Sequence, residues 1–198
     1  ALYKLATGKS PMEMCIPLGD IFTDTNVEYV VDEIVGASLA QQIVFGASGA
    51  AYQYDKVIFA LGAEPSYFNI PGIQEHAYQI KTVERALRLK KHLHELFYSH
   101  NGLSKGELMS HFQFVVVGGG PAGVELAGVL RKYTHELARA HGIPEHLVTV
   151  DILQSAPRLL PSMNEAVSQL ALKRLDALGI NVILNHAVTK QDENGVHL

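Results

Sequence analysis

Cysteine occurs only once in the 198 residues, at Cys15. A single thiol can form neither an internal disulfide nor a Cys-x-x-Cys pair, which favours a reducing compartment and argues against a dithiol mechanism. Lysine and arginine form no block, and 16 basic against 20 acidic residues give a formal net charge of −4. That balance argues against a nucleic-acid-binding surface.

Long apolar runs are missing too. No stretch approaches the roughly 20 residues that a helix needs to cross a bilayer, and no signal-peptide pattern opens the chain. The ten histidines are scattered, and the closest pair, His92 and His94, faces different ways on a predicted helix, so a metal site is not expected. With 47% hydrophobic and 18% charged residues, the composition is that of a soluble globular protein of one large or two small domains.

A glycine-rich stretch at residues 112–125 is the main motif. Residues 114–117 form an apolar, β-branched run typical of a parallel strand covered on both faces. Gly118, Gly120 and Gly123 follow at the spacing Gly-x-Gly-x-x-Gly, which serves a tight turn, close approach to a diphosphate and close helix packing, in that order. A diphosphate at this turn would meet the unpaired N–H groups and positive dipole of a helix N-terminus.

The surrounding residues favour this dinucleotide interpretation over its alternative, a glycine-rich turn with no ligand. Pro121 stands at the first helical position, which needs no N–H, and apolar residues recur at helical spacing as far as Leu137. Gly142 and Pro144 end that helix, and residues 148–153 supply a second strand. Strand, glycine turn, helix and parallel strand is the order that the motif requires.

Earlier in the chain, residues 1–24 are expected to be irregular because Pro11 and Pro17 break long elements. Short β-type runs then predict a meander, followed by an apolar strand at residues 57–62 that ends in glycine. The meander strands are expected at residues 28–31, 34–35, 41–45 and 50–54.

Further helices are predicted from their caps. Thr82 is expected to cap a helix to about Ser99, after which residues 101–106 are expected to be a linker and a domain boundary. A second helix is expected to start at Asn164 or Ser162. It should end before Gly179, with a third strand at residues 180–184 and an Asn-Gly hairpin turn at residues 193–195.

Taken together, several separated stretches resemble the flavoproteins with two dinucleotide-binding domains, and within them the type II NADH:quinone dehydrogenases. Residues 118–128 are similar to that family's NADH fingerprint, residues 60–63 to its second flavin motif, and residues 2–8 to the segment along the flavin ring. The remaining matches are residues 16–18, 54–55 and 69–72.

The resemblance implies an α/β fold. A Rossmann-like parallel sheet would belong to a partial NAD(P)H-binding domain at residues 112–198, and a β-meander to a partial FAD-binding domain at residues 1–81. Residues 82–111 would be the connecting helix and linker. The chain is then expected to be the central fragment of a longer enzyme, inactive by itself, able to hold NADH weakly and unable to hold FAD.

Site residues follow from the same resemblance. In the complete enzyme, hydride passes from NADH to FAD and electrons pass on to a quinone. The cofactor-binding residues of the NADH fingerprint are Gly118, Gly120, Pro121, Ala122 and Gly123. Glu125 is the implied catalytic residue, placed near the nicotinamide carboxamide. The alternative is that an acid in the first helical turn merely suits the helix dipole.

On the flavin side, the implied contacts are Thr7, Ile34, Ala60, Leu61 and Gly62. The alternative for the last three is that they merely end a buried strand.

The second strand should end in an acid that binds the adenosine ribose, and that position falls on Gln154. A neutral amide still pairs with a ribose hydroxyl but does not repel a 2′-phosphate, which Arg158 could meet. This combination predicts that NADPH is accepted beside NADH. The alternative is that Arg158 is a solvated loop charge.

The implied partners are a quinone acceptor and, through regions outside this sequence, a membrane surface; a homodimer stays open. The implied location is cytoplasmic, peripheral to the inner face of the cell membrane in the full-length enzyme. Ferredoxin- or rubredoxin-reductase-like and disulfide-reductase-like flavoproteins remain alternatives, although the Cys-x-x-x-x-Cys pair of the last class is absent near residues 3–7. A non-enzymatic NADH-binding module is a further alternative.

Overall fold

The computed structural model describes residues 2–14 and 16–198. Contacts within the chain divide it into two units, one formed by Ala1–Met14 with Pro65–Leu198 and the other by Cys15–Glu64. These divisions fall at other points than the predicted boundaries at residues 81 and 111. The assignment of cofactors to residues 1–81 and 112–198 stays a prediction.

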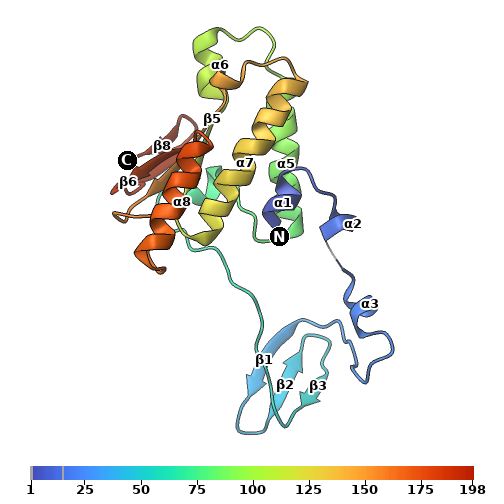
Figure 1. The fold of residues 1–198 in the computed structure, drawn as a ribbon. Helices are drawn as coiled ribbons and strands as arrows, with labels where there is room; N and C mark the ends of the chain where they lie inside the picture. Colours follow the sequence, from blue (N-terminus) through green and yellow to red (C-terminus); the bar gives the residue numbers. More distant parts are fainter. Residues whose placement is uncertain (1, 15) are drawn as a thin grey trace. The chain divides into compact units, whose positions relative to one another are not determined.

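A parallel sheet of three strands organises the larger unit, with the strand order β4-β5-β6. Figure 1 labels β5 and β6 of this sheet. Val117 lies opposite Leu153 in the parallel pairing of β4 with β5, and Gln154 lies opposite Leu184 in that of β5 with β6. The predicted order of strand, glycine turn, helix and parallel strand is confirmed. The elements are β4 (Gln113–Val117), α7 (Pro121–Ala140), η1 (Glu145–Leu147), β5 (Thr149–Gln154), α8 (Glu165–Ala177) and β6 (Asn181–Leu184).

Local signals set the ends of these helices as predicted. Pro121 is the first residue of α7, and Gly142 follows the end of that helix. Asn164 rather than Ser162 caps α8, because the Asn164 side chain accepts from the Val167 N–H at 2.9 Å. Each helix therefore starts where its own sequence supplies a cap or a proline.

The main hydrophobic core joins the sheet to α5 (Val83–Tyr98), α7 and α8. Thr82 caps α5 as predicted, by accepting from the Arg85 N–H at 3.3 Å. Phe97 of α5 is fully buried against Phe112, with ring centroids 4.6 Å apart. Burying such a side chain contributes about 1.5–3 kcal/mol.

The second face of the sheet is only partly covered. Leu153 of β5 packs there against Ile73 and Val188, close to α4 (Ile73–His76) and a hairpin of β7 (Lys190–Asp192) and β8 (Gly195–His197). The predicted hairpin is confirmed, but its turn consists of Glu193 and Asn194, since Gly195 already pairs with Asp192 as the first residue of β8. Val115 and Val117 of β4 are 37% and 47% exposed, so the burial on both faces that was expected of residues 114–117 is wrong. The neighbouring strand β5 is buried from Val150 to Leu153.

The smaller unit contains an antiparallel meander, as the sequence predicts. Its strands are β1 (Ile34–Ser38), β2 (Ile43–Gly46) and β3 (Ala51–Gln53), paired in that order. The predicted strands at residues 28–31 and 57–62 are wrong, since both stretches lie outside the strands. Neither has a partner strand among the described residues, and Ile58 is 90% exposed.

Short helices replace two stretches that were expected to be irregular. The prolines of residues 1–24 are compatible with helix starts, because Pro11 is the first residue of α2 (Pro11–Met14) and Pro17 is the N-cap of α3 (Leu18–Phe22). Ahead of them, α1 (Leu2–Ala6) contacts α5. The predicted linker at residues 101–106 runs into α6 (Lys105–His111), which starts at a capping box formed by Ser104 and Glu107.

Across residues 2–14 and 16–198, no helix has both the length and the apolar character needed to cross a bilayer.

Candidate functional site

The glycine turn, residues 118–123, lies at the carboxyl ends of β4 and β5. Gly118 has a φ of 106°, a left-handed value that favours glycine. Its N–H still donates to the Leu153 carbonyl of β5, at 2.8 Å. Ligand sites of open parallel sheets lie outside this edge, so the turn occupies the position expected of a cofactor site.

Gly119 is buried inside the turn and held by two hydrogen bonds. Its N–H donates to Gln154 Oε1 at 2.9 Å, and its carbonyl accepts from the Leu160 N–H at 2.8 Å. A Cβ at Gly119 would lie 2.7 Å from Leu159 Cδ2. The packing of the protein itself therefore explains this glycine.

Gly123 and Gly120 differ in what would meet an added side chain. A Cβ on Gly123 would collide with the Gly118 carbonyl oxygen and lie 3.6 Å from Val116 Cγ1, so Gly123 lets α7 start close to the strand. A Cβ on Gly120 would meet no heavy atom within 4 Å. Gly120 has φ −76° and ψ −179°, which alanine also adopts before proline. Neither backbone strain nor protein packing requires glycine at position 120.

The N-terminus of α7 is open. Gly120 is the N-cap residue and supplies no side-chain cap, and the first turn contains no acidic residue. Orphan N–H groups and the positive end of the helix dipole therefore stay available to an anion. Pro121 is the first helical residue as predicted, and both it and Ala122 are exposed.

Glu125 lies just beyond the first turn of α7, in which it was expected. It is the fifth residue of the helix rather than a member of the first turn, and its side chain is exposed. The dipole alternative for this carboxylate is therefore wrong, since the dipole acts within the first turn. The role of Glu125 near a nicotinamide stays a prediction.

Arg158 is half-buried, and backbone carbonyls of its own loop hold its guanidinium. Its Nη2 donates to the Pro161 carbonyl at 2.7 Å, and its Nη1 donates to the carbonyls of Met163 at 2.9 Å and Leu160 at 3.4 Å. The guanidinium thereby holds together the segment between β5 and α8. A 2′-phosphate at Arg158 would have to compete with these carbonyls, and this contact stays a prediction.

The predicted flavin residues lie in different units. Thr7 follows α1 in the larger unit, and its hydroxyl donates to the Tyr3 carbonyl at 2.9 Å. The other four lie in the smaller unit. Ile34 begins β1, whereas Leu61 is 80% exposed outside any strand and its neighbours are exposed as well. The alternative that residues 60–62 end a buried strand is therefore wrong, and the flavin contacts stay a prediction.

Two hollows lie away from the glycine turn. One, of about 380 Å³, is lined by His94, Glu95, Tyr98, Ser99 and His141. The other, of about 430 Å³, lies where the three parallel strands begin and is lined by Met109, Ser110, Gln113, Leu147, Thr149, Asp151 and Asn181.

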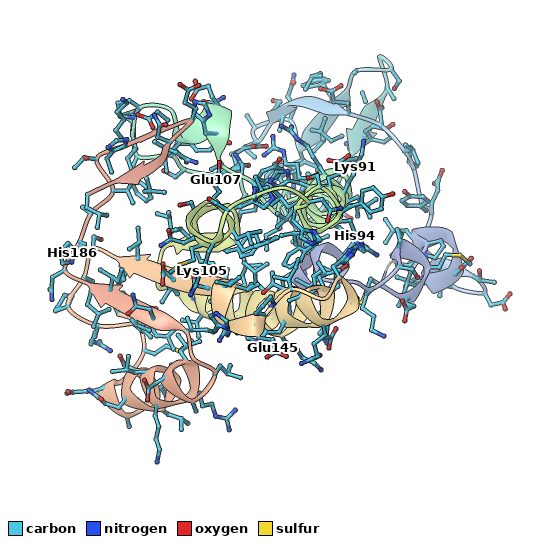
Figure 2. The ribbon with its side chains drawn as sticks, turned by 90° about the horizontal axis from the view of Figure 1, so that it is seen from above. Lys91, His94, Lys105, Glu107, Glu145 and His186 are labelled. Atoms are coloured by element: carbon cyan, nitrogen blue, oxygen red, sulfur yellow. The ribbon has the colours of Figure 1, made fainter. Side chains whose placement is uncertain are left out.

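No group of three or more potential metal ligands converges in the described part of the chain. His94 and His186 lie far apart in Figure 2, and His94 Nε2 is hydrogen-bonded to Tyr133 Oη at 2.7 Å. His94 is exposed and His92 is half-buried.

The sequence analysis missed Gly119 and Leu160. The Gly-x-Gly-x-x-Gly spacing treats position 119 as variable, and nothing local marks the Leu160 N–H as a partner of the turn. Two features of the sequence could have indicated the contact: the glycine at position 119, and the polar Gln154 at the end of the next strand.

Comparisons with known proteins agree with this arrangement. The family model described as pyridine nucleotide-disulphide oxidoreductase matches residues 5–198. Type II NADH:quinone oxidoreductase Ndh of Mycobacterium tuberculosis is 34% identical over 204 residues, covering 98% of this chain and 44% of that protein. External alternative NAD(P)H-ubiquinone oxidoreductase B1, mitochondrial, of Solanum tuberosum is 32% identical over 156 residues, covering 77% of this chain and 27% of that protein.

A solved structure shares the fold. NDH2 from Plasmodium falciparum in complex with NADH superposes with a TM-score of 0.81 at 23% identity, covering 97% of this chain and 41% of that chain. The chain thus spans less than half the length of these relatives. Since the family model matches nearly every residue, the chain belongs to the pyridine nucleotide-disulphide oxidoreductase family.

Proposed function

We propose that this chain forms the NADH-binding part of an FAD-dependent type II NADH:quinone oxidoreductase. The observation that carries the proposal is Gly120: its Cβ position is open, and nothing within the protein requires glycine there. A diphosphate lying against the backbone would fill that space. The similarity to type II NADH:quinone oxidoreductases supports the same cofactor.

The residues of the turn then have separate tasks. Gly118 and Gly123 shape the backbone, while Gly120 leaves room for the diphosphate beside the open N-terminus of α7. Pro121 and Ala122 form the exposed first positions of that helix. Glu125, on the next turn, would accept from the nicotinamide carboxamide and so orient the ring.

When bound, FAD supplies the hydride acceptor and passes electrons to the quinone. Thr7, Ile34, Ala60, Leu61 and Gly62 are the proposed flavin contacts. NADPH is proposed to be accepted beside NADH, because no carboxylate stands at the end of β5 to repel a 2′-phosphate. A quinone partner, contact with a membrane surface and a homodimer belong to the same proposal.

The test compares two glycine-to-alanine changes in the 198-residue chain. Gly120→Ala should leave the thermal unfolding temperature within about 2 °C and raise the Kd for NADH at least about tenfold, equivalent to ~1.4 kcal/mol. Gly123→Ala should instead lower the free energy of unfolding by about 1–3 kcal/mol, because its Cβ meets the Gly118 backbone. Calorimetry and titration of NADH fluorescence measure both quantities.

Gly106→Ala is the matched control. Its Cβ also meets nothing within 4 Å, but it lies on α6, so NADH affinity should not change. The proposal fails if Gly120→Ala binds NADH as tightly as the unchanged chain, or if the unchanged chain does not bind NADH.

A further inference from the structure

We infer that Gln154 is a positioning residue of the glycine turn: it fixes the Gly119 peptide from the end of β5. The inference rests on the proposed function, because that turn is the proposed diphosphate site. The sequence predicts a ribose contact for Gln154, whereas in the structure its side-chain oxygen already accepts from the Gly119 N–H at 2.9 Å.

This hydrogen bond determines how the Gln154 amide is oriented. A backbone N–H can only donate, so the atom that faces Gly119 must be the oxygen, and the amide NH₂ is left for other partners. Gly119 is buried and Gln154 is half-buried. Removing the acceptor would leave a buried donor without its partner, an arrangement that proteins rarely tolerate.

The opposite side of Gly119 is held by the same segment. The Gly119 carbonyl accepts from the Leu160 N–H at 2.8 Å. The turn is therefore held both by Gln154, the last residue of β5, and by Leu160, in the loop that follows β5. A Cβ at Gly119 would also lie 3.1 Å from Cβ and Cγ of Gln154. The aliphatic part of Gln154 therefore packs on the turn while its amide bonds to it.

The segment that supports Gly119 is itself fixed at several points. The Gln154 carbonyl accepts from the His186 N–H at 3.2 Å, which ties the end of β5 to the residues after β6. Arg158 binds the carbonyls of Pro161 and Met163. The buried Ser168 hydroxyl of α8 donates to the Leu159 carbonyl at 2.7 Å.

A support held in this way keeps the turn in its binding shape before the ligand arrives. Affinity then depends on Gln154 without a direct contact to the diphosphate, because ordering the turn on binding would cost free energy. If Gln154 has this role, removing its side-chain oxygen should make the glycine turn less ordered even without a ligand.

The experiment uses the 198-residue chain with three variants. Gln154→Met keeps the side-chain length but offers only a weak acceptor, and Gln154→Glu keeps a strong one. Gln169→Met makes the same chemical change at an exposed residue of α8. NMR-detected amide exchange of Gly119 without ligand is the first readout, and the Kd for NADH is the second.

Gln154→Met should speed exchange of the Gly119 amide at least about tenfold and raise the NADH Kd about tenfold. Gln154→Glu should keep the exchange of the Gly119 amide as slow as in the unchanged chain. Gln169→Met should change neither the Gly119 exchange rate nor the Kd for NADH. If the Gly119 amide exchanges as slowly in Gln154→Met as in the unchanged chain, the inference is overturned. If that variant also binds NADH more weakly, the result indicates a direct contact of Gln154 with the ribose instead. Should Gln154→Met not fold, faster Gly119 exchange in Gln154→Glu than in the unchanged chain overturns it.

These results are separable from the proposed function. If the unchanged chain does not bind NADH, the function fails, while faster exchange of Gly119 in Gln154→Met still supports the positioning of the turn.

Discussion

At the end of β5, a neutral amide stands where a carboxylate would repel a 2′-phosphate. The Gln154 oxygen accepts from the Gly119 N–H, and the amide NH₂ is available to a ligand as a hydrogen-bond donor. A donor suits a ribose hydroxyl oxygen and a phosphate oxygen equally. We therefore expect Gln154 not to select NADH against NADPH.

The unchanged chain is accordingly expected to bind NADH and NADPH with dissociation constants that differ by less than about a hundredfold, or some 2.7 kcal/mol. Gln154→Glu should widen the difference in favour of NADH, because one carboxylate oxygen can keep the Gly119 bond while the charge repels the 2′-phosphate. Fluorescence titrations with both nucleotides measure it. A larger preference for NADH in the unchanged chain would contradict this expectation.

At the scale of elements, the parts that could be predicted are those whose signals are local. Pro121 starts α7, Thr82 caps α5 and Asn164 caps α8, each through its own backbone geometry or a hydrogen bond a few residues away. The Gly-x-Gly-x-x-Gly turn is equally local. Such features survive in a sequence because they do not depend on distant partners.

The failures involve distant partners or competing local signals. Residues 57–62 have the composition of a strand, but a strand also requires a neighbour to pair with, which composition does not reveal. The two hydrogen bonds of Gly119 likewise involve distant residues. Gln154 lies 35 positions and Leu160 lies 41 positions after Gly119, and no spacing rule connects them to it. In α6, the capping box at Ser104 and Glu107 was a local signal overlooked beside two glycines.

One further junction between elements depends on charge. Glu145 of η1 accepts from Arg139 Nη1 at 2.9 Å and bonds to His135 Nδ1 at 2.7 Å, both on α7 (Figure 2 labels Glu145). The hydrogen bonds from Arg139 and then His135 lower the pKa of Glu145 below its ordinary value. A lowered pKa in the folded state means that this junction stabilises the fold above the ordinary glutamate pKa. The contribution is lost as the pH falls through the folded value.

Glu145→Gln is therefore expected to destabilise the chain at pH 7 and to lose that effect progressively below about pH 4.3. Urea unfolding of both proteins between pH 7 and pH 3 measures the difference. Glu136→Gln controls for the loss of a charge, since Glu136 lies on α7, between His135 and Arg139 in sequence, and its carboxylate is 4.0 Å from Lys132 Nζ. A difference between Glu145→Gln and the unchanged chain that grows on acidification would contradict the assignment.

For the whole molecule, burial is distributed unevenly between the two units. All three hydrophobic clusters of the described chain consist of residues from the larger unit. Among residues 16–64, no large hydrophobic side chain is buried, and Val31, Ile58 and Leu61 are at least 80% exposed. A three-stranded meander without a buried apolar face is marginal in water. Four of the five proposed flavin contacts belong to this weakly stabilised unit.

The smaller unit should therefore open first under protease attack, because cleavage requires local unfolding and local stability follows buried apolar contacts. Chymotrypsin at low concentration is expected to cut after Tyr29 and Phe59, which are 49% and 52% exposed, before it cuts after Phe97 or Phe112, which are fully buried. Mass spectrometry of early fragments identifies the sites. First cuts within residues 83–154 would show instead that the parallel sheet and its helices are the weaker part, and that the buried clusters do not set the order of opening.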